Sequence, residues 1–418
     1  MQGHLEDEKT SWLAFFTCFF VYVFVCMTKN TYASAMSAIV DEGLFNKADV
    51  GVINASFYLI YGCTQMFGGG LVDKFSPFKI LMFGVILSGM CNIVMAVSTS
   101  FVVMLVAWSI NGLAQFGIWP AILKLVATLV MPEHRQKSMT YLAFAYPVGT
   151  IISYLAAAGV LKVSKWSGLF WVSSAVLVIT VVFLHISAQH IQAKLVYDKE
   201  ETVERKNKEN LSQEKQVSLG RLLLVSGLIF MTIPALIRCM LDIGLKNWVP
   251  TMIMESYNIT PSFANFITTF LLIVNLFGVI LVNWLYPRYC KNAVTAIFIF
   301  FVVSIPLLIL ILLTGKINLV FIILSLALVT TFMIACSQLM NVIIPAMFEK
   351  QGRTGVIAGF LNSFGAFGCM AANYAYGYLA ENFGWTVTSV VWLVLCVISV
   401  VFCLVNAPIW KKFTKEGN

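Results

Sequence analysis

Long apolar runs, separated by short charged breaks, constrain the fold of this chain more than any other feature. Each run is about 20 residues long, which is the length that a helix needs to cross a hydrocarbon core about 30 Å thick. Of the 418 residues 11% are charged and 60% are hydrophobic, whereas a soluble domain carries about 25% charged residues. The chain is therefore predicted to be a membrane protein.

The runs predict an all-α membrane protein with twelve transmembrane helices in two six-helix bundles. The expected spans are 12–38, 48–71, 79–97, 101–124, 138–161, 167–187, 221–247, 262–286, 293–313, 318–346, 354–379 and 385–407. A long polar stretch rich in Lys and Glu, typical of a solvated linker, follows the sixth span. The expected parts are a cytoplasmic N-terminus 1–11, an N-terminal bundle 12–187, a cytoplasmic linker 188–218, a C-terminal bundle 219–407 and a cytoplasmic tail 408–418.

The distribution of Lys and Arg predicts the orientation. With a cytoplasmic N-terminus, the inner loops and tails hold nineteen of the 27 Lys and Arg residues and the outer loops hold five, namely Lys47, Lys162, Lys165, Lys246 and Lys316. Because cytoplasmic loops carry the positive excess, both termini are expected inside the cell (inner) membrane. The first run is too long for a cleavable signal peptide. The net charge of +8 then reflects topology, and no nucleic-acid partner is expected.

Few ionisable residues fall inside the spans, and each is a candidate functional residue because charge is costly there. Lys29 lies roughly 25 Å along the first span. Arg238 and Asp242 stand four residues apart in the seventh span, so they share a helix face and can pair. A silent internal salt bridge between these two is the structural alternative. Lys124 lies near the cytoplasmic end of the fourth span, where it can snorkel to the interface.

Polar side chains accompany these charges. Tyr22, Cys26 and Lys29 recur at helical spacing on one face of the first span. Further candidates for a substrate site are Tyr61 and Gln65 in the second span, Tyr146 in the fifth and Asn362 in the eleventh. Each alone is equally typical of hydrogen bonding between helices. Together they predict a polar cavity near the middle of the membrane.

No hydrolytic or redox motif accompanies the spans. The chain carries no P-loop, no GxSxG and no His/Glu cluster, and its ten cysteines show no CxxC spacing. Buried thiols of this kind act as small hydrophobic groups. We therefore expect no enzyme activity, no cofactor and no metal site. Without an ATP site, transport would depend on an ion gradient or on exchange.

The two halves show weak internal similarity. "MPEHRQKSMTYLAFAYPVG", which begins at Met131, joins the fourth and fifth spans, and "MFEKQGRTGVIAGFLNSFGAFG", which begins at Met347, joins the tenth and eleventh. Each places Met and an acidic residue before Arg, with glycine half a span later. Related sets of six spans are typical of transporters whose substrate site lies between the halves.

The loop "GGLVDKFSPFK", residues 69–79, resembles the loop motif of the major facilitator superfamily, with Asp73 and Lys74 matching and Ser76 replacing a glycine. Residues 29–43, 61–73, 112–124 and 244–252 resemble its organophosphate:phosphate antiporters, the glycerol-3-phosphate transporter-like family. The resemblance implies the major facilitator fold. It also implies a cytoplasmic gate at which Asp73, next to Lys74, meets a helix N-terminus or an arginine, with Lys124 and Arg135 as nearby candidates.

The departures from that family bear on the substrate. The phosphate-clamping arginine of its first span falls on Lys29, and that of its seventh span falls on Asp242. A family lysine falls on Gln65 and a family histidine on Tyr146, while Tyr22 falls on a family tyrosine. Because lysine lacks the fork of arginine and Asp242 reverses a charge, a dianionic phosphate is less favoured than a monoanion.

These features predict a monomeric secondary active transporter that moves a small organic anion, a carboxylate or phosphate ester, across the cytoplasmic membrane by alternating access. Protons or a counter-transported anion would be its coupling partners, with the lipid bilayer as its surroundings. Lys29 and Arg238 are expected to contact the anion. Asp242 is expected to couple protons or to switch as a partner of Lys29. The alternatives are a transporter-like membrane sensor of a small metabolite and an efflux pump for amphipathic compounds.

Overall fold

The structure, a computed structural model, describes residues 3–5, 7–197, 219–289, 292–314, 318–348 and 354–416, and these are almost entirely helical. The first half contains β1 (Gly3–His4), α1 (Glu8–Lys29), α2 (Thr31–Asp41), α3 (Lys47–Lys74), α4 (Pro77–Val97), α5 (Phe101–Gln115), α6 (Ile118–Leu129), α7 (Pro132–Leu142), α8 (Ala145–Val160), α9 (Trp166–Ala193) and β2 (Val196–Tyr197).

The second half contains two π-helical turns, η1 and η2, among its α-helices. Its elements are α11 (Leu219–Val225), α12 (Leu228–Cys239), η1 (Met240–Gly244), α13 (Leu245–Tyr257), α14 (Pro261–Tyr289), α15 (Ala293–Thr314), α16 (Leu319–Gln338), η2 (Leu339–Ile343), α17 (Ile344–Ala346), α18 (Thr354–Asn382) and α19 (Gly384–Glu416). Most of the predicted linker, residues 198–218, lies outside the described residues.

Eleven segments of the described chain are long and apolar enough to cross a membrane, and they overlap eleven of the predicted spans. The remaining predicted span, 48–71, coincides with α3, but part of that helix has side chains outside the described set. An all-α, multi-pass membrane protein is therefore observed, and the count of twelve helices in two bundles stays a prediction.

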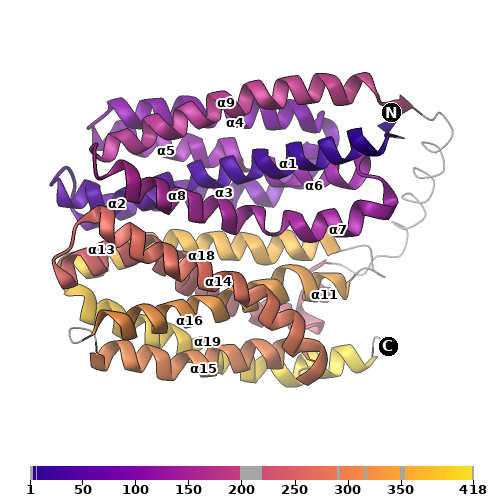
Figure 1. Cartoon of the computed structure of the whole chain (residues 1–418). Coiled ribbons are helices and arrows are strands. Elements are labelled where there is room, and N and C mark those ends of the chain that lie inside the picture. The colour runs from indigo at the N-terminus through magenta and orange to yellow at the C-terminus, as the bar shows by residue number, and fades with distance from the viewer. Residues whose placement is uncertain are drawn as a thin grey trace. The chain divides into compact units, whose positions relative to one another are not determined.

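The chain forms two compact units. Unit 1 comprises Met1–Tyr32 and Cys63–Gln216, and unit 2 comprises Ala33–Gly62 and Val217–Asn418. In unit 1, α4 lies beside α9, and α1 packs against α6, α8 and α9 (Figure 1). In unit 2, α12 packs against α18 and α19, while α16 packs against α14 and α15. The predicted domain boundaries differ from these units in residues 33–62.

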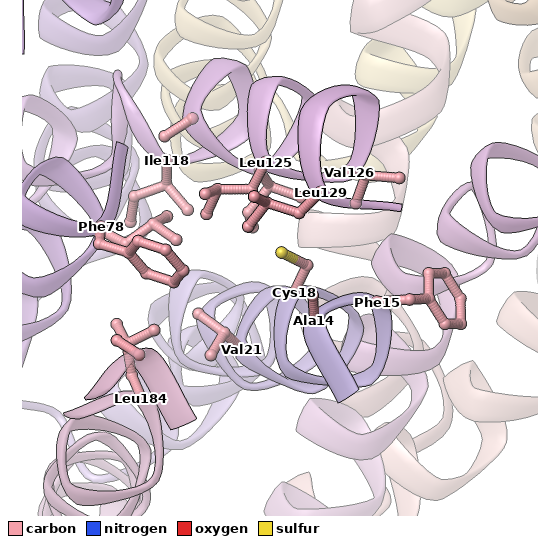
Figure 2. Close-up of a cluster of buried hydrophobic side chains, with 14 of the residues drawn as sticks. Ala14, Phe15, Cys18, Val21, Phe78, Ile118, Leu125, Val126, Leu129 and Leu184 are labelled. Atoms are coloured by element: carbon pink, nitrogen blue, oxygen red, sulfur yellow. The ribbon is translucent and has the colours of Figure 1, made fainter. Parts of the chain in front are cut away.

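The core of unit 1 is built from apolar faces that meet across sequence-distant helices. Figure 2 shows Cys18 of α1 between its own helix and Leu125 and Leu129 of α6, with Phe78 and Leu184 nearby. All of these side chains are buried. This packing fixes α1, which carries Lys29 at its end.

Several predicted spans are interrupted rather than continuous. The first breaks between α1 and α2, the fourth between α5 and α6, and the fifth between α7 and α8. The seventh and tenth each contain a π-helical turn. Interrupted helices expose backbone polar groups, and within membranes such irregularity occurs where it is buried in protein or lines a cavity. Three of these irregular points lie beside residues singled out by sequence, namely Lys29, Tyr146 and Asp242.

Candidate functional site

Three charged side chains lie along one membrane-spanning segment of unit 2. Arg238 belongs to α12, Asp242 to η1 and Lys246 to α13, and none is more than 6% exposed. Arg238 Nη1 lies 3.7 Å from Asp242 Oδ2, and Lys246 Nζ forms an ion pair with Asp242 Oδ1. The spacing of four residues places all three on one helix face. The carboxylate is therefore held between two cations, with one net positive charge.

The helix changes to π geometry at this charged turn, Met240–Gly244. Such turns are rare and frequently occur at functional sites. Glycines let α18 approach closely here: a Cβ on Gly244 would lie 3.0 Å from Tyr376 Cε2, and one on Gly365 would lie 3.2 Å from Arg238 Nη2. The charged turn is thus enclosed by α18 with no space for larger side chains at either glycine.

The prediction that Lys246 lies in an outer loop is wrong. Because α13 continues to Tyr257, Lys246 lies inside the candidate span Leu228–Tyr257. The polar run around Lys246 resembles the exit of a span, but its partners are internal: Asp242 pairs with Lys246, and Asn373 accepts from Asn247. The observed i, i+4 spacing of Asp242 and Lys246 was the sequence signal that could have found this pair.

Buried thiols surround the guanidinium of Arg238. Its Nη2 donates to Cys239 Sγ at 2.6 Å, and the Cys239 thiol is hydrogen-bonded to that of Cys369. Cys336 is buried close enough to interact with Arg238 as well. Within the described chain, no group of three His, Cys, Asp or Glu side chains is arranged to hold a metal ion. These thiols therefore pack against the cation as small polarizable groups.

In unit 1, Lys29 is the last residue of α1, at the break before α2. A cation is favoured at a helix C-terminus, where the carbonyl groups carry partial negative charge. The neighbouring Asn30 secures the break, because its Nδ2 donates to Cys26 O at 2.7 Å and to Thr150 Oγ1 at 3.2 Å. Tyr22 and Lys29 both interact with the Cys26 thiol, so the structure brings the predicted polar face together.

Tyr146 lies in the first turn of α8, which packs directly on α1. Close approach is possible because a Cβ on Gly149 would lie 2.7 Å from Cys26 Cβ. Tyr22 of α1 packs against Trp119 of α6 in a tilted arrangement, with ring centroids 4.7 Å apart. The structure therefore places Tyr22 on α1 and Tyr146 on α8, the helix that packs against it.

The other predicted substrate residues are distributed between the units. Tyr61 stacks on Phe57 with centroids 5.9 Å apart and belongs to unit 2, whereas Gln65, one turn along α3, belongs to unit 1. Asn362 is half-buried on α18 in unit 2. Lys29 and Asp242 also belong to different units, so their predicted pairing stays a prediction.

The predicted cytoplasmic gate is only partly described. The side chains of Asp73 and Lys74 lie outside the described set. Lys124 is half-buried on α6, and Arg135 on α7 donates from Nη2 to Val130 O at 3.3 Å. The gate therefore also stays a prediction.

Sequence reasoning did not anticipate two polar clusters in unit 2. In one, the buried Asn373 Oδ1 accepts from Asn54 Nδ2 at 2.7 Å and from Asn247 Nδ2 at 3.0 Å. In the other, Lys47 Nζ lies 2.9 Å from Glu255 Oε1 and 3.5 Å from Glu381 Oε2. The members of each cluster are more than 100 residues apart in sequence, so local spacing gives no signal for them.

A model of the Major Facilitator Superfamily matches residues 18–369 and 235–417. The chain belongs to this superfamily. A probable hexose phosphate transport protein of Chlamydia muridarum is 22% identical over 405 residues, covering 89% of this chain and 85% of the relative. The glycerol-3-phosphate transporter of Bacillus subtilis is 21% identical over 290 residues, covering 66% and 65%. The membrane sensor protein UhpC of Escherichia coli is 27% identical over 94 residues, covering 22% and 21%.

A crystal structure of a bacterial homologue of the human lysosomal transporter Spinster, inward-facing and unoccupied, has the same fold. The TM-score is 0.80 at 13% identity, and the alignment covers 97% of this chain and 98% of that one. The predicted resemblance to organophosphate:phosphate antiporters is confirmed by the superfamily match and by relatives with sugar-phosphate and glycerol-3-phosphate transporter names.

Proposed function

We propose that this superfamily member is a secondary active transporter that moves a small organic anion across the cytoplasmic membrane by alternating access. One observation carries the proposal: a membrane-buried segment holds Arg238 and Lys246 against a single carboxylate, Asp242. A charge this deeply buried is costly and marks a substrate or ion pathway. The net charge of the trio is positive, which favours an anion over a cation.

The relatives support a phosphate ester as the anionic group, because two of them carry the names of hexose phosphate and glycerol-3-phosphate transporters. A phosphate ester of lower charge, or a carboxylate, suits this chain better than a dianion, since Asp242 repels a second negative charge. The driving force would be a proton gradient or exchange for a second anion. We place both termini in the cytoplasm, on the Lys and Arg distribution.

In this proposal Lys29 and Arg238 contact the anion, and Asp242 is the coupling or charge-switch carboxylate. The polar lining would come from Tyr22, Tyr61, Gln65, Tyr146 and Asn362. The cytoplasmic gate would be formed by Asp73, Lys74, Lys124 and Arg135. The protein is proposed to act as a monomer.

Counterflow into proteoliposomes tests the function. Vesicles preloaded with candidate phosphate esters or carboxylates should accumulate the matching labelled anion, and Arg238→Ala should abolish accumulation. Neutral sugars and amines of similar size serve as controls. Accumulation of amines or neutral sugars, but of no anion, would contradict the proposal.

A membrane sensor of a small metabolite is the second candidate, because a named membrane sensor protein is among the relatives. A sensor binds its ligand without steady uptake. Ligand-induced thermal stabilisation with no counterflow, measured on the same preparation, would favour the sensor.

A further inference from the structure

Arg238 and Lys246 are fixed on one helix with Asp242 between them. The Arg238 guanidinium offers a planar fork of donors that matches the oxygens of a carboxylate or phosphate. Its contact with Asp242 is long, at 3.7 Å, and its Nε is buried and makes no hydrogen bond. The guanidinium therefore has donor capacity that Asp242 and the Cys239 thiol leave unused.

When a membrane protein releases an anion that was bound between two buried cations, the charges of these cations are left uncompensated. Removing one member of a buried ion pair costs about 3–5 kcal/mol, because the remaining charge is left uncompensated. A carboxylate on the same helix avoids this cost. This carboxylate pairs with the two cations when no other anion is bound, and its ion pairs with them can break one after the other.

We propose that Asp242 is an internal counter-ion, and that an anionic group of the substrate takes its place between Arg238 and Lys246. This inference rests on the proposed function and adds Lys246 as a substrate-binding residue. It also names the charge class. While Asp242 is ionised, Arg238, Asp242 and Lys246 together carry one net positive charge, which matches a monoanionic group.

A dianion meets repulsion from Asp242 at this site. Two like charges about 4 Å apart interact by about 4 kcal/mol at an effective dielectric constant of about 20. Asp242 therefore sets the preference between monoanions and dianions. On one side of this turn α18 packs closely, with Gly365 against Arg238 and Tyr376 against Gly244.

The test compares inorganic phosphate with acetate as stabilising ligands of the full chain in lipid nanodiscs. The measurements are made at about pH 8, where phosphate is mainly dianionic because its second pKa is about 6 to 7. Asp242→Asn should strengthen apparent phosphate binding by about tenfold or more, the repulsion being removed, with a smaller change for acetate. Lys246→Gln should weaken both anions.

Two variants control the result. Asp242→Asn/Lys246→Gln restores the single net positive charge, so its phosphate-to-acetate preference should return to about that of the wild type, within about threefold. Asp41→Asn removes an exposed carboxylate of unit 2 and should change nothing. If Asp242→Asn unfolds at low ionic strength, its rescue by phosphate should exceed that of the wild type.

The proposal is overturned if Asp242→Asn weakens both anions equally, as loss of a merely structural salt bridge would do, or leaves their ratio unchanged. Counterflow distinguishes this failure from failure of the proposed function. Uptake of an organic anion by the wild type, with an unchanged anion preference in Asp242→Asn, contradicts the counter-ion role alone. Absence of anion uptake contradicts the function itself.

Discussion

The turn around Lys29 in unit 1 and the turn around Asp242 in unit 2 share one construction. In unit 1, Cys26 stands three residues before Lys29. Gly149 of α8 packs against that cysteine so closely that a Cβ added to the glycine would lie 2.7 Å from Cys26 Cβ. This contact joins the first predicted span to the fifth.

In unit 2, Cys239 stands three residues before Asp242. Gly365 of α18 packs against Cys239 so closely that a Cβ added to the glycine would lie 2.8 Å from Cys239 Sγ. These elements belong to the seventh and eleventh predicted spans. Gly149 and Gly365 each follow the Met of the duplicated stretch by eighteen residues. The packing is therefore repeated in the two halves.

The charge is not repeated. Lys29 stands at the end of a helix, where a single cation is favoured by the helix dipole. Asp242 stands in the π-helical turn between α12 and α13 and pairs with one cation from each of these two helices. The glycine and cysteine contacts thus belong to the architecture shared by both halves, whereas the charges distinguish the two halves functionally.

The largest effect is expected from Asp242→Lys, which gives the turn around residue 242 a positive charge like that of Lys29. Three cations would then share one buried helix face, and each unpaired one costs about 3–5 kcal/mol. We expect little or no folded protein, measured as monodisperse yield in size-exclusion chromatography. Asp41→Lys, at an exposed site, is the control. Normal yield of Asp242→Lys would show that the segment is far more hydrated than its burial implies.

Lys29→Met should separate function from folding in the first turn. Transport is expected to fall about a hundredfold, equivalent to about 2.7 kcal/mol. The unfolding free energy should change by less than about 1 kcal/mol, because Lys29 is only half-buried. Counterflow and thermal unfolding are compared with Lys162→Met, at an exposed position. Transport by Lys29→Met at the wild-type rate would remove it from the substrate site.

The shared packing predicts matched effects of alanine at the two glycines. Gly149→Ala and Gly365→Ala should each destabilise by about 1–3 kcal/mol through overpacking. Each helix provides its own control, because a Cβ on Gly159 of α8 or Gly359 of α18 meets nothing within 4 Å. Alanine there should be neutral or stabilising by up to about 1 kcal/mol, since glycine is a poor helix former. A large difference between Gly149→Ala and Gly365→Ala would contradict the likeness of the two turns.

The smallest effect concerns the start of α1, where Asp7 caps the helix that ends at Lys29. The hydroxyl of Thr10 and the ammonium of Lys194 donate to Asp7 and lower its pKa from 3.8 to about 2. A lowered pKa stabilises the folded state above pH about 4, and this contribution is lost as pH falls towards about 2. The stability difference between the wild type and Asp7→Asn, which retains a capping side chain, should therefore shrink over that range. A difference independent of pH would show that the Asp7 charge does not contribute.

Apolar length and charge distribution were sufficient to predict the helical class and the positions of the membrane spans. The superfamily was also predictable from the loop after the second span. The breaks in the helices could not be predicted, because the break beside Asn30 involves a hydrogen bond to Thr150, which is 120 residues away in the sequence. Lys246 was misassigned for a different reason: its spacing of four residues from Asp242 was visible in the sequence, but the polar run around it resembles the exit of a span.

The π-helical turn at Met240–Gly244 makes this segment sensitive to chain length. A π turn holds more residues than an α turn, and one residue of an α-helix corresponds to about 100° of rotation. Deleting a single uncharged residue there would restore a regular helix and shorten the spacing of Arg238 and Lys246 from eight residues to seven, which keeps both cations on one face. The position of Asp242 between them would change, although every charged residue would remain in the sequence. Such a deletion would therefore alter the charge arrangement through the π geometry alone.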